Sequence, residues 1–530
     1  MKIIYSCFPG FMFLCLVTST ASAQTIFQKT FKKQQIGGFW SMTALTNPVQ
    51  TFDGGYAVIM TTGYFDIFMM KTDESGSIQW TLFFGDTMFN SAMRLQQTLD
   101  SGFIISGNTG RMENNGFYQL LLSKVSQSGQ LEWAKFYSQG GVSESPGYYV
   151  QQTRDDGFIV TGVGAIADSL CNFSSKLFLL KTNADGNLEW SKTFSDSAYD
   201  CGFCVEQTFD GGFIIAGRSG SNYYDMDIAL IKTDSAGNLE WGKRAGGTNC
   251  DEANSVKQLK NGGYILTGYT ASFGLLPRGF IMKADASGNI QSFKTFEAYG
   301  QESGNDIELT NDGGYIIAGT RSDSTRHGFI LKLDSLENLQ WSKSFGGVLW
   351  NAFSGIRQTN DGGFIISGLG QDVWAGYGKI DLIKTDEQGN SACAMIDDST
   401  IILDEPCEEL SGFTELPGSF VEYEWPLSSQ QILVSENIVC ISTNVSNVND
   451  SNRDFKIFPN PSHDFISIKH ESLELQNIII VNSLGQVIYE KLLSNDGDII
   501  TLNVSQLPNG FYLLRLQCGD KFKMETFVKD

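Results

Sequence analysis

The 530-residue sequence has few histidines and little positive charge. It contains three His, and 37 Lys plus Arg against 59 Asp plus Glu, for a formal net charge of −22. Nucleic acid binding needs clustered Lys and Arg, so this balance disfavours a nucleic acid partner. Only His327 precedes residue 453. A histidine-based metal centre or a Ser-His-Asp triad is therefore disfavoured in that part, unless His327 serves in it.

Signatures of several enzyme classes are also missing. The sequence has no phosphate-binding loop, dinucleotide fingerprint or nucleophile elbow. After residue 23, no stretch is apolar for the roughly 20 residues that a membrane span needs. Paired carboxylates for glycoside hydrolysis stay open, because residues 24–392 contain 38 Asp plus Glu.

The N-terminus has the pattern of a secretory signal peptide. A lysine at position 2 precedes a mostly apolar stretch, and Ala21-Ser22-Ala23 forms a small-x-small cleavage site. We expect residues 1–23 to be removed between Ala23 and Gln24 on export. Eight Cys remain, including Cys201 and Cys204 at CxxC spacing. With no second CxxC, disulfides or free buried thiols are favoured over zinc, and Cys393–Cys407 is a reasonable disulfide pair.

One short motif occurs seven times before residue 393. It consists of an Asx residue, a variable residue, Gly and an aromatic residue that opens a β-rich run. The copies begin at Asp53, Asp100, Asp155, Asp210, Asn261, Asp312 and Asp361. Each copy predicts a hairpin turn that the Asx side chain caps, with the third-position Gly at positive φ.

A second turn motif follows each of these turns. It opens on a Lys and leads, in the better copies, through a Gly to a Trp. The copies with a Trp run from Lys71 to Trp80, Lys124 to Trp133, Lys181 to Trp190, Lys232 to Trp241 and Lys332 to Trp341, whereas those at Lys283 and Lys384 lead to Ser292 and Cys393. In the copy at Lys332 the Gly is replaced by Glu337. We interpret the Trp residues as packing between neighbouring repeats.

Two hairpins in each repeat give four strands, the content of one β-propeller blade. Six repeats end in a fourth strand, but the seventh lacks it. Residues 28–31 at the mature N-terminus match the missing strand. We therefore predict an all-β protein in which residues 24–392 form a seven-bladed β-propeller, closed by the N-terminal strand.

The Lys-to-Trp motif is similar to the docking hairpin of quinoprotein propellers and to the Asp-box hairpin of sialidases. Both resemblances concern structural turns, so we expect no cofactor and no metal. Calcium is the alternative that the repeated Asp residues and the next segment suggest. Residues 393–452 contain 11 Asp plus Glu and no Lys or Arg. We interpret them as an acidic connector that is partly extended.

Residues 453–530 show strand signals again. Phe458-Pro459-Asn460-Pro461 opens the segment, Leu484-Gly485-Gln486 follows an apolar strand, and Leu507-Pro508-Asn509-Gly510-Phe511-Tyr512 precedes the terminal strand. In this order the segment resembles the type A C-terminal sorting domain of type IX (Por) secretion cargo, typical of Bacteroidota. The resemblance implies a small Ig-like β-sandwich that the translocon and the sortase recognise. It also implies a protein that crosses the outer membrane and is then secreted or anchored at the cell surface.

The variable loops between hairpins and between blades are the predicted binding face, because variable loops on a rigid ring usually carry function. Their aromatic, basic and acidic side chains suit a sugar or a peptide. The candidates are Trp40, Tyr223, Tyr224, Asp225, Arg278, Arg321, Arg326, His327, Trp350, Trp374 and Tyr377.

Two functions remain open. We interpret the protein as a binding or adhesion module for an extracellular glycan or protein, without catalysis. The alternative is a secreted carbohydrate-active hydrolase or lyase with carboxylates on the variable-loop face. Carboxylates converging with an Arg or a Tyr at the mouth of the channel would favour the enzyme, and a shallow aromatic face would favour binding.

Overall fold

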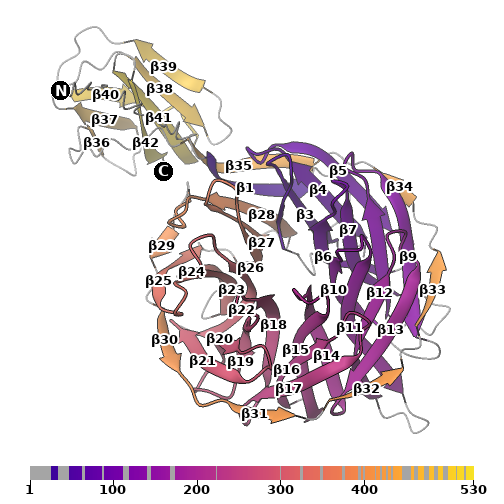
Figure 1. The fold of residues 1–530 in the computed structure, drawn as a ribbon. Helices are drawn as coiled ribbons and strands as arrows, with labels where there is room; N and C mark the ends of the chain where they lie inside the picture. The colour runs from indigo at the N-terminus through magenta and orange to yellow at the C-terminus, as the bar shows by residue number, and fades with distance from the viewer. Residues whose placement is uncertain are drawn as a thin grey trace, which may run out of the picture.

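The protein is all-β, as predicted. Within the described residues, all regular secondary structure of the computed structural model is β-strand (Figure 1). The structure describes residues 25–33, 47–62, 66–85, 89–110, 118–139, 145–167, 173–222, 224–298, 300–322, 326–345, 350–372, 377–391, 395–397, 400–411, 413–417, 420–424, 428–430, 434–443, 455–458, 464–470, 477–482, 487–492, 499–508, 510–518 and 521–529. Ala23 and Gln24, at the predicted signal cleavage site, lie outside them.

The repeats appear as seven antiparallel four-stranded units in the described part of the chain. Units 1 to 3 contain β2 (Val49–Gln50), β3 (Tyr56–Thr61), β4 (Ile67–Thr72) and β5 (Ile78–Gly85); β6 (Phe89–Gln97), β7 (Phe103–Gly110), β8 (Tyr118–Val125) and β9 (Leu131–Gln139); and β10 (Gly147–Gln152), β11 (Phe158–Ala167), β12 (Phe173–Thr182) and β13 (Leu188–Ser195). Units 4 and 5 contain β14 (Tyr199–Gln207), β15 (Phe213–Asn222), β16 (Asp225–Thr233) and β17 (Leu239–Gly246); and β18 (Asp251–Gln258), β19 (Tyr264–Thr270), β20 (Arg278–Ala284) and β21 (Ile290–Glu297). Units 6 and 7 contain β22 (Gln301–Leu309), β23 (Tyr315–Ser322), β24 (Arg326–Leu333) and β25 (Leu339–Phe345); and β26 (Trp350–Gln358), β27 (Phe364–Asp372), β28 (Tyr377–Thr385) and the N-terminal β1 (Thr25–Lys33).

The units stand side by side around a centre, with their first strands innermost (Figure 1). In six of the seven turns that open with Asx, a backbone N–H donates to a Gln at the end of the next unit's first strand. The pairs are Phe52 to Gln97, Leu99 to Gln152, Arg154 to Gln207, Phe209 to Gln258, Asn311 to Gln358 and Asn360 to Gln50. The last pair joins unit 7 to unit 1, and the contact is missing only between units 5 and 6 among the described residues, where Leu309 replaces the Gln.

The acidic connector adds a fifth strand to every unit. The seven strands, which we call the belt, are β29 (Met395–Asp397), β30 (Ile401–Asp404), β31 (Glu408–Ser411), β32 (Thr414–Pro417), β33 (Phe420–Glu424), β34 (Ser428–Gln430) and β35 (Val434–Thr443). They pair with the outermost strands of units 6, 5, 4, 3, 2, 1 and 7, in that order. The belt therefore circles the ring against chain order, along its outside (Figure 1). It covers edges that would otherwise be open to other chains.

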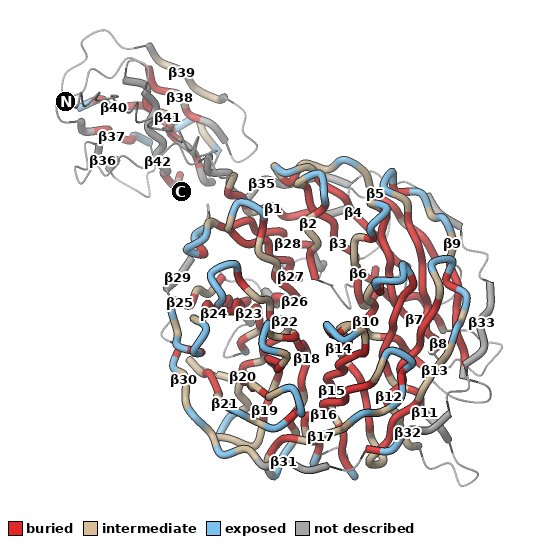
Figure 2. The backbone as a smooth tube through the Cα atoms, in the orientation of Figure 1, coloured by how far each residue is buried: buried red, intermediate tan, exposed pale blue. Residues whose placement is uncertain are grey.

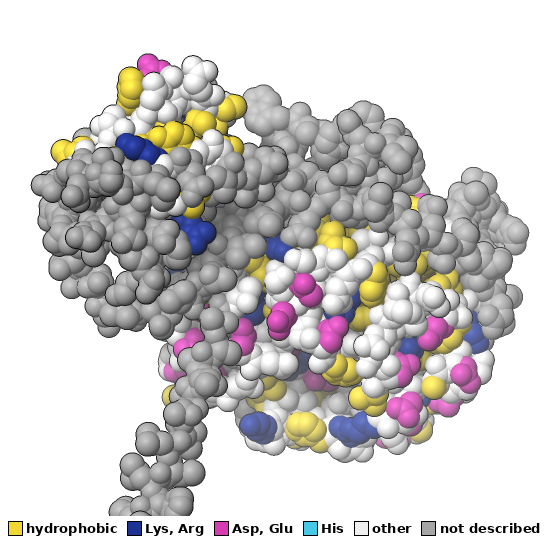
Figure 3. All heavy atoms as spheres, turned by 90° about the horizontal axis from the view of Figure 1, so that it is seen from above, with side chains coloured by type: hydrophobic (Ala, Val, Ile, Leu, Met, Phe, Trp, Pro, Cys, Tyr) yellow, Lys and Arg dark blue, Asp and Glu magenta, His cyan; other side chains and the backbone are white. Residues whose placement is uncertain are grey.

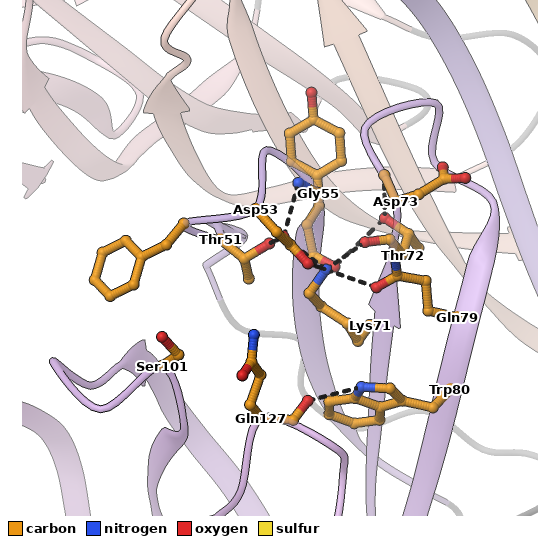
Figure 4. Close-up of polar contacts among 12 residues, drawn as sticks. Thr51, Asp53, Gly55, Lys71, Thr72, Asp73, Gln79, Trp80, Ser101 and Gln127 are labelled. Atoms are coloured by element: carbon orange, nitrogen blue, oxygen red, sulfur yellow. Dashed lines mark hydrogen bonds and ion pairs between the residues drawn. The ribbon is translucent and has the colours of Figure 1, made fainter.

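A buried ammonium group joins the two hairpin turns of a unit. In unit 1, Lys71 Nζ donates to Asp53 Oδ2 (2.9 Å), to the Thr72 carbonyl (2.7 Å) and to Gln79 (2.9 Å) (Figure 4). The same Lys–Asp pair forms in units 2, 3, 4, 6 and 7. Burial opposes ionisation of Asp210 in unit 4. Hydrogen bonds from Thr208, Lys232 and Gly212 outweigh it and lower the pKa of that carboxyl to about 2.

The prediction for the glycine of this turn was wrong in one respect. The second residue of the motif has the positive φ, 85° at Gly54 and 65° at Asp156, whereas the third-position Gly does not. The third residue is Gly for another reason. A Cβ at Gly55 would lie 2.0 Å from the Thr72 carbonyl oxygen and 2.6 Å from Lys71 Nζ. The third Gly therefore makes room first for the carbonyl of the residue after the lysine, and then for the lysine itself.

The recurrent Trp packs between neighbouring units, as predicted. Trp190 packs against Phe213 of unit 4, with ring centroids 6.0 Å apart and the ring planes tilted by 58°, and covers Gly237. Equivalent contacts join Trp80 to Phe103, Trp133 to Phe158, Trp241 to Tyr264 and Trp341 to Phe364. On β1, Phe27 takes the place of the Trp. It packs on Tyr56 at 5.8 Å and over Gly76 of unit 1.

Unit 5 breaks this pattern in a compensated way. Ser292 stands where the Trp would be, and the facing turn of unit 6 has Glu337 in place of Gly, at φ 64°. Glu337 fills the vacated space, where Ser292 donates to it at 2.7 Å. Lys283 also turns to Glu337, at 2.7 Å, because Asn261 replaces the aspartate that would hold it. A carboxylate and a lysine thus replace an indole ring.

Residues after the belt form two further sheets with one shared hydrophobic core. The first contains β36 (Phe455–Phe458), β37 (Phe465–His470) and β40 (Ile499–Asn503), and the second β38 (Asn477–Asn482), β39 (Val487–Leu492), β41 (Gly510–Cys518) and β42 (Lys521–Lys529). Ile468, Ile480 and Leu514 are among the residues of that core. In the repeat units, the strands are mostly buried and the exposed residues lie mainly in the turns that join them (Figure 2).

We expect Gly237→Ala to destabilise the protein more than Gly313→Ala. Both have φ near 80° and would bear the roughly 1–2 kcal/mol cost of a left-handed non-glycine residue. A Cβ at Gly237 would also lie 2.5 Å from Trp190, whereas nothing lies within 4 Å of one at Gly313. The clash should add about 1–3 kcal/mol. Urea unfolding measures both, and equal midpoints would contradict the Trp–Gly contact.

Removal of the belt should open the outer edges of the ring. We expect a chain of residues 24–392 to melt at a lower temperature than residues 24–452 and to self-associate, because β1 and the other outer strands lose their partners. Thermal unfolding and analytical ultracentrifugation test this. Two monomeric chains with equal melting temperatures would show that the belt strands add nothing to the ring.

Candidate functional site

A polar cavity of about 430 Å³ lies at the centre of the ring. Its lining residues come from the first strands of six units and from the turns that follow two of them. They are Val49, Gln50, Thr51, Phe52, Arg94, Leu95, Gln96, Gln97, Tyr149, Val150, Gln151, Lys257, Glu308, Arg357, Gln358 and Asn360. Because Thr51, Phe52 and Asn360 belong to Asx-opened turns, the cavity lies at the turn end of the ring.

Strand periodicity brings these side chains to the centre. Residues six and four positions before the Asx of each turn lie on one face of the first strand, because side chains alternate along a strand. The pairs at these positions include Arg94 with Gln96, Tyr149 with Gln151, and Asp306 with Glu308. These two positions differ in chemistry from unit to unit, whereas the Gln that follows them recurs in six units.

One side of the cavity is a network of ion pairs. Arg357 Nη1 lies 2.5 Å from Asp306 Oδ2 and 3.2 Å from Glu308 Oε2. Lys257 Nζ lies 3.5 Å from the same Glu308 atom. Burial opposes ionisation of Asp306, but Arg357, Arg94 and Lys257 outweigh it and hold its pKa below the usual range. Burial likewise disfavours the charge of Lys257, but Glu308 and Glu206 outweigh it and raise its pKa.

The other side, which we call the donor wall, consists of Arg94, Gln96, Tyr149 and Gln151 of units 2 and 3. Arg94 Nη2 donates to the Tyr149 hydroxyl at 2.8 Å, and the guanidinium stacks 4.1 Å from the centre of the Tyr149 ring. Burial raises the pKa of Tyr149 to about 12, so the phenol stays neutral. Gln96 and Gln151 each accept a backbone N–H of the next unit through Oε1 (2.6 Å). Their Nε2 donors find no acceptor among the described residues.

Of the residues predicted on the variable-loop face, those whose side chains the structure describes do not line this cavity. Tyr224 and Asp225 are exposed at the start of β16. Arg278 pairs with Glu297 (2.6 Å) and with Glu405 of the belt (3.1 Å). The buried Arg321 pairs with Glu302 at 2.6 Å and lies opposite His327 in the strand register. Trp40, Tyr223 and Trp374 lie outside the described residues, and of Arg326, Trp350 and Tyr377 only the backbone is described.

The cavity residues were missed, although a signal for them exists in the repeats. The recurring turn drew attention to what the copies share. The copies differ at two alternating positions of the first strand, which carry Arg94 in unit 2 and Asp306 in unit 6. When the repeats are aligned on the Asx residue, several units carry polar or charged residues at these two positions of the first strand, which is otherwise largely apolar.

The thiols and carboxylates offer no evident chemistry. Cys201 and Cys204 are free and buried, and burial raises the pKa of both. Cys393 lies outside the described residues, so its pairing with Cys407 stays a prediction. The described residues hold no group of three His, Cys, Asp or Glu suited to a metal ion.

On the face in Figure 3, acidic and basic side chains are interspersed rather than segregated.

The C-terminal segment matches a known family model. Residues 456–530 match the secretion system C-terminal sorting domain. The protein is therefore a type IX secretion substrate, secreted or attached to the cell surface. Of the motif residues, Tyr512 is buried, donates to the Pro508 carbonyl (2.5 Å) and stacks on Phe527. Leu507 packs against the core and Gly510 opens β41. Pro459, Asn460, Pro461 and Gly485 lie outside the described residues.

Solved structures with low sequence identity also resemble this chain. No curated protein matches the sequence. A protein of unknown function from Dyadobacter fermentans is 8% identical, with a TM-score of 0.35 over 68% of this chain and 98% of its own. The polysaccharide lyase Uly1 is 10% identical, with a TM-score of 0.42 over 67% and 92%. A structure of NanB with Optactamide is 10% identical, with a TM-score of 0.36 over 67% and 70%. Among the described residues, no helix has the length and apolarity to cross a membrane.

The two arginines of the cavity should respond differently to removal. Arg357→Met would leave the buried Asp306 without its ion pair, which should cost about 3–5 kcal/mol at pH 7. Arg94→Met breaks a hydrogen bond to a neutral phenol and should cost about 1 kcal/mol.

The pH dependence gives a second check on the same pair. In the native chain, the stability from ionised Asp306 is lost as the pH falls through its lowered pKa. Without Arg357 the carboxyl should take a proton more readily, so the gap between Arg357→Met and the native chain should narrow from pH 7 to pH 4. Urea unfolding at both pH values measures this, and a gap independent of pH would contradict the role of the pair.

Proposed function

We propose that the chain is a seven-bladed β-propeller, carried to the cell surface by the type IX system, that binds an extracellular ligand in its central cavity without catalysis. An Ig-like sorting domain at 453–530 would deliver it. The observation that supports the binding role most is the donor wall, where buried and half-buried donors face an open cavity.

The ring contacts support the propeller. The aromatic contact that joins successive units also joins β1 of unit 7 to unit 1, through Phe27 and Gly76. The backbone bond from Asn360 to Gln50 repeats this closure at the inner end. A ring of this kind holds side chains from separate repeats in fixed positions around a central site.

An enzyme remains the competing function, because the carboxylate of Glu308 lines this cavity together with two arginines and a tyrosine. Their contacts favour binding instead. Arg357 pairs with both Asp306 and Glu308, and Lys257 pairs with Glu308 as well. The lowered pKa of Asp306 makes that carboxyl a poor general acid, and the carboxylate of Glu308 is engaged by two cations. The pairs fix the shape of the cavity and leave its donor wall to meet a ligand.

Screening the mature full-length chain on glycan and peptide arrays tests the proposal. We expect binding that Gln151→Trp abolishes, because the larger ring would fill the cavity, and that Tyr224→Ala leaves intact. If Tyr224→Ala abolished binding and Gln151→Trp did not, the ligand would bind at the variable loops instead of the central cavity. A reducing-sugar assay runs alongside. Sugar release that Glu308→Gln abolishes would establish the hydrolase or lyase in place of the binding module.

A further inference from the structure

The donor wall has the chemistry of a carboxylate site. We infer that it binds the carboxylate of a uronic acid residue in an acidic polysaccharide. This inference rests on the proposed binding function and names the ligand class of the same cavity.

Arg94 is the cation that makes the site selective for an anion. Its side chain is only 7% exposed, yet it lines the cavity. Its hydrogen bond goes to the neutral hydroxyl of Tyr149, and no carboxylate of the described residues lies within ion-pair distance of it. Arg357 and Lys257, by contrast, already pair with carboxylates. A bound carboxylate would give Arg94 the planar, charged partner that a guanidinium fits best.

Two amides extend the donor set beside Arg94. The Oε1 atoms of Gln96 and Gln151 accept the backbone N–H groups of Gln152 and Gln207, which fixes the orientation of both amides. Each Nε2 is therefore left to donate at the cavity wall. Tyr149 accepts from Arg94 and keeps its own hydroxyl hydrogen for a further acceptor. The donor wall thus offers several donors to one anionic group.

The remaining lining favours a sugar over a peptide. Sugar hydroxyls both donate and accept, and the cavity supplies both functions through the amide of Asn360, the amide nitrogen of Gln50 and the charges of Lys257 and Glu308. Phe52, 64% exposed at the mouth, offers a ring for stacking on a sugar face. Glu308 on the opposite side would repel a carboxylate, so the acidic group should face Arg94.

Calorimetric titration of the mature full-length chain with a galacturonic acid trisaccharide tests the inference. The neutral galactose trisaccharide and an acidic tripeptide serve as comparison ligands. The key variant is Gln96→Glu, which keeps the acceptor for Gln152 but replaces the donor with a repelling charge. Gln79→Glu is the control, because it adds the same charge outside the cavity, at a position where units 2, 3 and 4 carry Glu132, Glu189 and Glu240.

We expect the uronate to bind at least tenfold more tightly than the neutral sugar, and Gln96→Glu to weaken it at least tenfold. Arg94→Gln should also weaken binding of the uronate at least tenfold, whereas Gln79→Glu should bind it with the affinity of the native chain. Equal affinity for both sugars, still lost in Gln151→Trp, would overturn the carboxylate site and leave the binding function standing. Binding of the tripeptide but not the uronate would also overturn it. Failure of every array ligand would instead count against the binding function itself.

Discussion

The ring depends on one recurring contact, in which an aromatic side chain on the outer strand of six of the seven units packs over a glycine in the next unit's turn. Trp190 over Gly237 is one example, and Phe27 over Gly76 makes the same contact between the last unit and the first. Because the N-terminal strand supplies that last aromatic ring, closure joins the two ends of the repeat region. Between units 5 and 6, Ser292 and Glu337 stand in place of the aromatic residue and the glycine and form a hydrogen bond. The space between units must therefore be filled, but an indole ring is not the only side chain that can fill it.

The belt completes what the ring contacts leave open. Each four-stranded unit has an outer edge, and the seven edges are covered by one segment that passes them in reverse order. Its charge fits its position, since Glu405 meets Arg278 and Asp404 meets Lys294 of unit 5. The belt follows the ring in the sequence and precedes the sorting domain, so one continuous segment leads from the last unit around the ring to the C-terminal sheets.

Structure and function occupy different positions within the same repeat. The Asx, the Lys and the third Gly recur because they hold two turns together around a buried ammonium group. The residues that line the cavity instead lie at two positions of the first strand that face the centre. These positions take no part in the contact between the two turns. Units 6 and 7 place ion pairs there, and units 2 and 3 place Arg94, Tyr149 and two amides. A scaffold of similar parts thereby presents a cavity with two chemically different sides.

The sequence by itself determined the all-β class, the repeat and its packing aromatic, and the C-terminal delivery segment, because these follow from local patterns that recur or match. It did not show that the third Gly is required by the close approach of the Thr72 carbonyl rather than by a positive φ, because that contact lies between two separate hairpin turns. It also predicted the acidic segment only as an extended connector, because strand pairing with seven separate units is not a local property. The cavity was decided by tertiary structure alone. Arg94 and Arg357 lie 263 positions apart in the sequence, and only the ring brings side chains of distant repeats to one centre.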